Sequence, residues 1–182
     1  GNGNWSDPTR WSTNAVPSPT DIASISAAGT YTVNVNQNVN VAGLQVGGGS
    51  SGTQTLQQNG WIITANGPSS VQSNGVLQAY GTINGTGTLT NLGTINSYYT
   101  TFDVALANQA LLTLRGSTYL HASLTTTASS IIRSEGDYNC CGSYTYLDNG
   151  FTNNGAIELT SINGTGTYSS FNVQSGQLVN AS

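Results

Sequence analysis

The chain has 182 residues, only 5% of them charged, and its formal net charge is −4. Soluble domains usually carry about 25% charged residues, so Asn, Thr, Ser and Gln must supply the solubility here. With three basic residues there is no basic patch, which argues against a nucleic-acid partner, and no apolar run is long enough to span a membrane.

A surface without lysine offers few sites to trypsin-like proteases, which suits an extracellular or cell-surface protein. The missing initiator Met suggests a mature chain after signal removal, or an excised fragment. We therefore expect an extracellular location and a single domain with a sizeable core.

Residues 1–29 differ in composition from the rest of the chain. They hold Trp5, Trp11 and three of the four prolines. Large aromatic side chains and turns fixed by proline can cover the unpaired strand edges at the end of a stack of strands. We predict an N-terminal cap or leader segment over 1–29, with an extended leader along the side of a coil as the alternative.

The same region carries a family-like pattern. Asn4-Trp-Ser-Asp-Pro-Thr-Arg-Trp-Ser12 is followed by Val16-Pro17, Asp21 and Ile22. This pattern resembles the opening of bacterial secreted and surface β-helix proteins, such as autotransporter passengers and adhesin-like β-solenoids. The resemblance implies an architecture and a surface location. It implies no single activity, because such proteins include adhesins, scaffolds and enzymes.

Residues 31–41 show the clearest alternation of apolar and polar residues. Tyr31, Val33, Val35, Val39 and Val41 fall on one face, and Thr32, Asn34, Asn36, Asn38 and Asn40 on the other. The pattern predicts a half-buried strand with a row of Asn outside. Such a row can be a structural ladder or can present amides to a sugar or a partner, and we favour the structural role.

Residues 53–97 contain short repeats. Gly-Thr-Ile-Asn occurs at 81–84 and 93–96, and Ile-Asn-Gly-Thr-Gly-Thr occurs at 83–88 and 162–167. Each copy predicts a very short strand ended by Asn-Gly or Gly, and strands so short must stack on copies of themselves. Asn-Gly suits the corners of a coil, with the hairpins of a meander as the alternative. At about 20–25 residues per coil, we expect about six to eight coils over 30–182.

Residues 133–150 break the pattern and predict a loop insertion. A weak calcium candidate lies here, formed by Glu135, Asp137, Asn139 and Asp148, although we favour a solvated acidic loop. We expect no other metal or cofactor. The adjacent Cys140 and Cys141 predict a disulfide within the pair, with an intersubunit bond as the alternative.

Little in the sequence points to an enzyme. Hydrolytic β-helix enzymes need clustered carboxylates, whereas the seven acids of this chain are scattered. His121 is the only histidine and lies in no nucleophile motif. We therefore expect a non-enzymatic protein.

These observations predict an all-β fold: a single-stranded, parallel, right-handed β-helix with an N-terminal aromatic and proline-rich cap. The last residues resemble an ordinary rung, and an uncovered strand edge favours pairing with another chain. We predict head-to-tail self-assembly into surface fibres or a matrix. The interface candidates are Trp5, Trp11, Phe171, Val173, Leu178 and Val179.

Two other functions stay open. The alternative is an adhesin or carbohydrate-binding module that holds a polysaccharide or a cell surface, and an exposed stripe of aromatic residues would favour it. The third is a polysaccharide-degrading enzyme, which would need a groove with two carboxylates within about 10 Å of each other.

Overall fold

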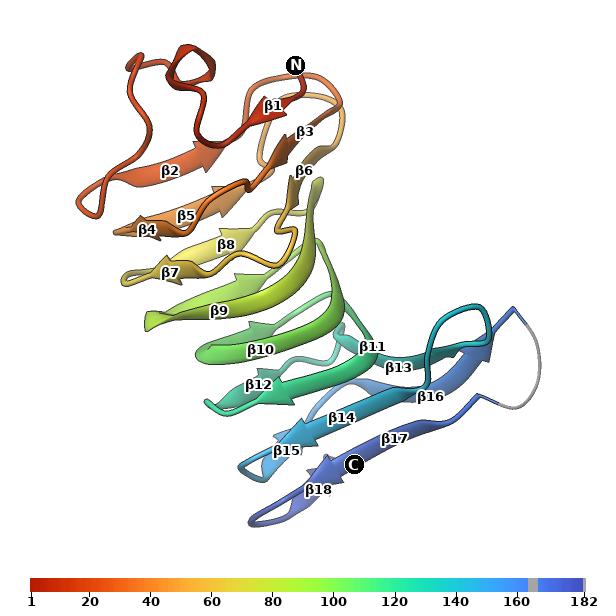
Figure 1. Cartoon of the computed structure of the whole chain (residues 1–182). Coiled ribbons are helices and arrows are strands. Elements are labelled where there is room, and N and C mark those ends of the chain that lie inside the picture. Colours follow the sequence, from red (N-terminus) through yellow and green to blue (C-terminus); the bar gives the residue numbers. More distant parts are fainter. Residues whose placement is uncertain (164–166, 182) are drawn as a thin grey trace.

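The computed structural model of this chain describes residues 1–163 and 167–181. They form a parallel β-solenoid of about seven turns, which confirms the predicted fold class and number of coils (Figure 1). The named strands pair in parallel from coil to coil, so the Asn-Gly dipeptides at 59–60, 66–67, 74–75 and 84–85 lie at coil corners and not in hairpins. One short 3-10 turn, η1 (Pro8–Arg10), precedes the first complete coil.

The strands stack on three faces, numbered here in the order in which each coil visits them. Face 1 holds β1 (Gly3–Asn4), β3 (Tyr31–Asn34), β6 (Gln54–Gln57), the first parts of β9 (Gly75–Asn91), β10 (Thr94–Asn108) and β11 (Leu111–Leu120), then β13 (Ile131–Asp137) and β16 (Ala156–Ile162). Face 2 holds β4 (Val39–Val41), β7 (Ile63–Ala65), the middle of β9 and β10, the end of β11, β14 (Ser143–Leu147) and β17 (Ser169–Val173). Face 3 holds β2 (Ile22–Ile25), β5 (Gly43–Val46), β8 (Ser69–Val71), the ends of β9 and β10, then β12 (Leu124–Thr126), β15 (Phe151–Asn153) and β18 (Leu178–Asn180).

The prediction of very short strands that end at each Gly is wrong for the centre of the molecule. Strand β9 has 17 residues and pairs in turn with β6, β7 and β8, so it continues through two corners. Gly81 and Gly85 have φ of +120° and +133° there, a region that glycine reaches without a steric penalty. The repeat copy at 81–88 therefore marks bends within one long strand, whereas Gly93 of the second Gly-Thr-Ile-Asn copy immediately precedes β10. The copy at 162–167 lies partly outside the described residues.

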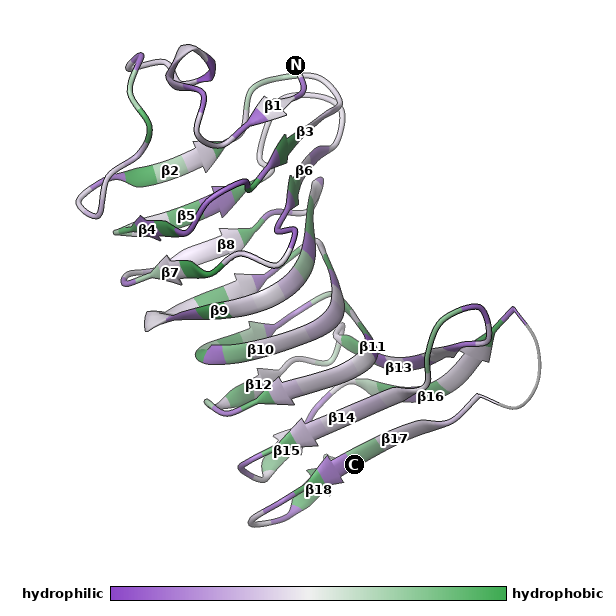
Figure 2. Ribbon diagram, in the orientation of Figure 1, coloured by the Kyte–Doolittle hydropathy of each residue, from purple (hydrophilic) through white to green (hydrophobic). Residues whose placement is uncertain are grey.

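Apolar side chains stack in register to make the core. On face 1 the stack is Leu56, Leu77, Ile95, Leu112 and Ile132, and on face 2 it is Ile63, Ile83, Phe102, Leu120 and Leu147. All of these are buried, and Figure 2 shows apolar segments recurring from one coil to the next. Because each coil buries its side chains against the next, the core is continuous along the axis.

A buried amide ladder lies on face 3, and the sequence reasoning did not foresee it. The Asn91 side chain donates to Asn108 Oδ1 at 2.7 Å, and Asn108 donates to the Ile131 carbonyl at 3.2 Å. Further along, Asn153 donates to Asn180 Oδ1 at 3.2 Å. Buried amides need such partners, and these bonds tie successive coils together.

The segment 31–41 forms two strands, β3 and β4, with a corner between them, and not the single strand predicted. Its apolar residues Val35, Val39 and Val41 are buried as predicted. The Asn residues of the corner and of β4 have structural partners: Asn36 bonds Ser6, Asn38 accepts from the Ile62 amide, and Asn40 accepts from Asn66. Among the described residues, the Asn34 side chain has no such bond.

The N-terminal segment packs on the first coil. Trp5 is 1% exposed, its ring lies 4.9 Å from that of Trp11, and Trp11 Nε1 donates to the Trp5 carbonyl at 2.9 Å. Strand β2 lies within 1–29 and pairs with β5, so solenoid pairing begins before residue 30. The burial of Trp5 contradicts its choice as an interface candidate.

The loop insertion predicted at 133–150 is much shorter in the structure. Strands β13 and β14 occupy most of it and pair with β11, and only 138–142 connect them. The sequence misled because the outward side chains of β13 are charged. Arg133 and Glu135 are nevertheless held in ion pairs on the outer side of face 1, where Glu135 is largely buried.

Candidate binding groove

A groove runs across the outside of face 1 near its corner with face 2. It has a volume of about 380 Å³ and is lined by Gln57, Gln78, Ala79, Tyr80, Asn96, Tyr98 and Tyr99. These residues come from three successive coils, on β6, β9 and β10. The lining thus consists of side-chain amides, tyrosines and one alanine, with no carboxylate.

A row of side-chain amides forms one side of this groove and continues beyond it. Residues opposite one another in the parallel register are Asn4, Asn34, Gln57, Gln78 and Asn96, named here the amide row. In the part of the chain that the structure describes, none of these five amides has a hydrogen-bond partner. Each therefore keeps its donors and its acceptor for solvent or a ligand.

Other amides close to the row are fully engaged, which makes the contrast informative. Gln58 is buried, donates to the carbonyls of Trp61 and Thr82, and accepts from the Tyr80 amide. Asn74 donates to Gly49 and Gly52 and accepts from Gly48. The solenoid thus uses its corner amides for structure and leaves the amide row unused.

Tyrosines form the other side of the groove. Tyr80 and Tyr99 are each 47% exposed, and they occupy the same corner one coil apart. Tyr80 lies against Gly60, and Tyr99 lies so close to Gly116 that a Cβ there would sit 2.8 Å from its ring. Glycines at these corners therefore leave space in which the rings can lie.

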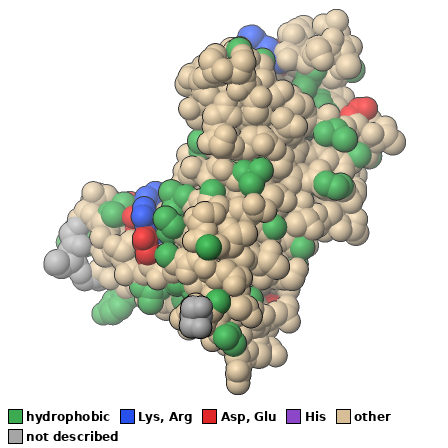
Figure 3. Space-filling view, turned by 180° about the vertical axis from the view of Figure 1, so that it is seen from behind, with side chains coloured by type: hydrophobic (Ala, Val, Ile, Leu, Met, Phe, Trp, Pro, Cys, Tyr) green, Lys and Arg blue, Asp and Glu red, His purple; other side chains and the backbone are tan. Residues whose placement is uncertain are grey.

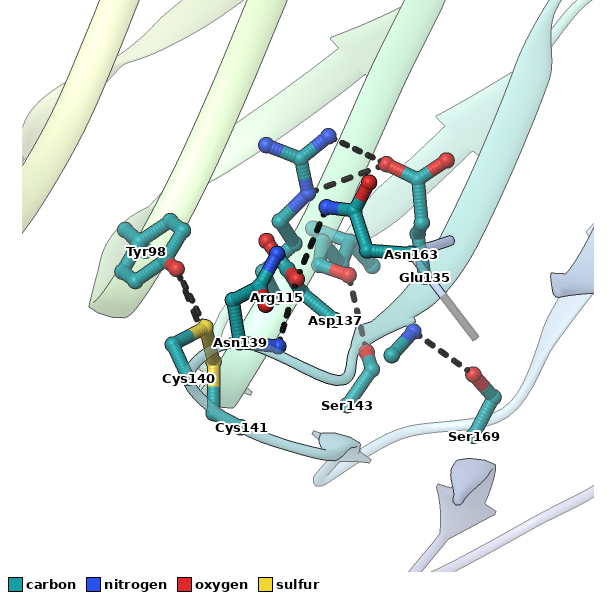
Figure 4. The surroundings of a disulfide bond; sticks show 12 residues. Tyr98, Arg115, Glu135, Asp137, Asn139, Cys140, Cys141, Ser143, Asn163 and Ser169 are labelled. Carbon is teal, nitrogen blue, oxygen red and sulfur yellow. Dashed lines mark hydrogen bonds and ion pairs between the residues drawn. A yellow bond between two sulfur atoms is a disulfide. The ribbon is translucent and has the colours of Figure 1, made fainter. Parts of the chain in front are cut away.

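Tyr98 connects the groove to the disulfide. Its hydroxyl contacts Cys140 Sγ and lies 3.6 Å from Cys141 Sγ, and Figure 4 shows the ring directed from β10 towards the sulfur atoms. Cys140 and Cys141 are joined to each other, at the end of the turn between β13 and β14. Hydrogen bonds from the Asn163 side chain and the Asn139 backbone hold this turn and lower the pKa of Asp137.

The structure does not bring the calcium candidates together. Glu135 is paired with Arg115, Asp137 and Asn139 bond each other, and Asp148 lies beyond the far end of β14. Among the described residues, no group of three or more His, Cys, Asp or Glu side chains could hold a metal ion.

Charged side chains occur in a few separate places, as the face in Figure 3 illustrates. Arg133 pairs with Glu158 at 2.6 Å, and His121 Nδ1 lies 2.7 Å from Asp103 Oδ1 on face 2. Both pairs lie outside the groove lining.

The two Arg–Glu pairs of face 1 differ in burial, so their contributions to stability can be predicted separately. Glu135 is 8% exposed and Glu158 is 41% exposed. We expect Glu135→Ala to lower the free energy of unfolding by about 2 kcal/mol, because Arg115 loses its partner in a desolvated place. The matched variant Glu158→Ala is expected to cost less than about 1 kcal/mol. Urea unfolding of both variants measures the difference, and equal losses would contradict the prediction.

The remaining interface candidates lie on the last coils. Phe171 and Val173 are partly buried on β17, and Leu178 and Val179 on β18 are 37% and 48% exposed. Trp11 is partly buried beside Trp5 at the opposite end of the solenoid.

The sequence reasoning missed the groove itself, although a signal was present. Gln78 and Tyr80 are separated by one residue, as are Asn96 and Tyr98. Each pair ends a short segment of the same pattern, VLQAY at 76–80 and TINSY at 94–98. Recognising this requires the coil register, which places the two pairs side by side.

No helix among the described residues has the length and apolar character needed to cross a membrane. The chain matches no protein-family model, and neither a curated protein nor a solved structure shows significant similarity to it.

Proposed function

We propose that this protein is a non-enzymatic, extracellular β-solenoid module that binds a glycan in the groove of face 1. The observation that carries the proposal is the amide row. Among the described residues, five in-register amides are left without partners, tyrosines lie beside two of them, Gln78 and Asn96, and neighbouring amides are bonded. This contrast is expected of a surface kept for a polar ligand.

The chemistry of the groove suits sugars. A pyranose ring has an apolar C–H face, which packs on an aromatic ring, and a rim of hydroxyls, which both donate and accept hydrogen bonds. Tyr80 and Tyr99 offer exposed rings, and each amide offers donors and an acceptor together. Because no carboxylate lines the groove, a neutral glycan fits it better than a cation would.

The acids of face 1 support binding without turnover. Glycoside hydrolysis needs two carboxylates that flank the scissile bond. Glu135 and Glu158 are each held by an arginine, and Asp137 accepts hydrogen bonds from Asn139 and Asn163. None of the three acids lines the groove.

Affinity electrophoresis tests the proposal in gels that contain soluble glucomannan, xylan, hydroxyethylcellulose, starch or polygalacturonate. We expect at least one neutral polysaccharide to retard the protein. The double variant Tyr80→Ala, Tyr99→Asn should weaken retardation about tenfold, since two stacking contacts are lost. Asparagine is chosen because Tyr99 has φ of +49°, which Asn tolerates.

The matched control is Tyr144→Ala, which removes another exposed tyrosine outside the groove and should leave retardation unchanged. Failure of every polysaccharide to retard the wild-type protein would refute the proposal. Equal retardation of the double variant would refute the assignment to this groove.

A second candidate function, self-association with another copy of the chain, is favoured by the last described coil. Leu159 is 57% exposed, although its register partner Ser134 is buried, and Leu178 is exposed beside the buried Phe151. In the described chain, β16, β17 and β18 each pair with one earlier strand only, as β1, β2 and β4 each pair with one later strand. The exposed Leu159 and Leu178 would become buried if this coil met another copy of the chain.

Light scattering after gel filtration, with negative-stain electron microscopy, tests this second candidate. We expect assemblies that grow with protein concentration and dissociate in the variant Leu159→Arg, Leu178→Arg. The variant Tyr144→Arg is the control for an added charge elsewhere. A monomer at all concentrations would rule this candidate out and leave glycan binding untouched.

A further inference from the structure

We infer that the groove takes an extended, neutral β-1,4-linked hexopyranose chain that lies along the solenoid axis, one sugar per coil. This inference rests on the proposed function and names its ligand class. The inference follows from the spacing of the amide and tyrosine side chains along the groove. This spacing is set by the pairing of the strands and not by loops.

The amide row runs parallel to the solenoid axis. Its members are register partners on β1, β3, β6, β9 and β10, so each step is one strand spacing of about 4.8 Å. Five positions span about 19 Å. A ligand that uses all of them must be elongated and must repeat its hydrogen-bonding groups at nearly this interval.

The tyrosines lie on the second line of the same track. Tyr80 follows Gln78 by two residues, and Tyr98 follows Asn96 by two. Residues two apart on a strand point to the same side and lie about 6.7 Å apart. The track is therefore about one sugar ring wide, with amides along one edge and with aromatic rings beside the two amides Gln78 and Asn96.

Linkage geometry selects among polysaccharides. A β-1,4-linked hexopyranose chain is a flat ribbon whose advance per residue is close to one strand spacing, so each amide can meet one sugar. Neighbouring sugars are turned by half a turn, so the amides meet the O2/O3 edge and the O6 edge in alternation, and side-chain amides can bond hydroxyls of either edge. An α-1,4-linked chain coils and turns its hydroxyls away from a straight row. The flat ribbon matches the groove, and the coil does not.

The track has a defined end, which limits the ligand. In the register, Asn96 is followed by Thr113, which is buried, and then by Arg133. Beside them, Tyr98 is followed by Arg115, which is held by Glu135. A neutral glycan can therefore contact unbonded amides over five coils. Sugars beyond the fifth would lie against the ion-paired side chains of the next coils.

Isothermal titration calorimetry with cello-oligosaccharides and malto-oligosaccharides, from the disaccharide to the hexasaccharide, tests the inference on the full chain. We expect the Kd of the cello series to fall with each added sugar up to about five and then to level off. The malto series should bind at least about tenfold more weakly at equal length.

Three single variants test the orientation of the ligand. Gln57→Ala, Gln78→Ala and Asn96→Ala should each raise the Kd of cellopentaose about fivefold, because each removes one hydrogen-bonding side chain. Their melting temperatures should stay near that of the wild type, because these amides have no internal partners. Gln37→Ala, at an exposed corner outside the row, is the control.

The outcomes separate the inference from the proposed function. Equal affinity for the two series, or an effect confined to Gln78→Ala, would overturn the axial β-1,4 ligand. If neither series binds but a gel polysaccharide still retards the protein, the ligand class is wrong and glycan binding stands. If none of the probes binds, both fail.

Discussion

Gly85→Ala is expected to lower the free energy of unfolding by about 4 kcal/mol, one of the largest effects of any single methyl group in this chain. Gly85 has φ of +133° at a bend of β9, where an L-residue is strained. A Cβ there would also lie 2.0 Å from the Ala65 carbonyl oxygen of the previous coil. The strain and the clash act together, because neither chain segment can move without breaking the ladder of strand pairs.

Gly29→Ala separates the two causes. Gly29 has φ of +110°, but nothing lies within 4 Å of a Cβ placed on it. We expect this variant to show only the cost of the backbone conformation, about 1–2 kcal/mol. Chemical denaturation of both variants provides the test. If Gly29→Ala loses as much stability as Gly85→Ala, the backbone conformation alone explains the need for glycine at position 85, and the clash with the previous coil does not contribute.

Phe102→Ala is expected to cost about 3–5 kcal/mol, through the lost transfer free energy and the cavity left behind. Phe102 is fully buried in the middle of the face 2 stack, between Ile83 and Leu120. Coils on both sides contact it, so the damage is not confined to an end of the solenoid. The change is measured by urea unfolding with circular dichroism.

Thr101→Ala is the matched control for Phe102→Ala. Thr101 is the preceding residue on β10, points outward and is only partly buried. It should change stability by less than about 0.5 kcal/mol. A loss near 3 kcal/mol for Thr101→Ala would mean that the backbone of β10, and not the Phe102 side chain, carries the effect.

The groove and the residues with large predicted effects on stability lie on different sides of the same strands. Inward residues of β9 and β10 hold the coils together, and the outward residues Gln78, Tyr80 and Asn96 line the groove. Variants of outward residues should therefore change binding without unfolding the protein. This independence makes the binding experiments interpretable.

The sequence by itself determined the kind of fold. Alternation at 31–41, Asn-Gly corners and repeated Gly-Thr-Ile-Asn units are local signals, and they predict short rungs that must stack because none buries enough surface alone. The disulfide between Cys140 and Cys141 could also be predicted, because these two adjacent residues are the only cysteines in the sequence.

Only the tertiary structure decided the register between coils, and the register decides which side chains line the groove. Asn34 and Asn36 look alike in the sequence, yet Asn36 bonds Ser6 and Asn34 joins a row of unused amides. Likewise Asn91 and Asn108 are buried and bonded, while Asn96 between them lies in the groove. Side-chain direction changes with every residue of a strand, so which asparagines meet across coils follows from pairings about 20 residues apart, which no local pattern encodes.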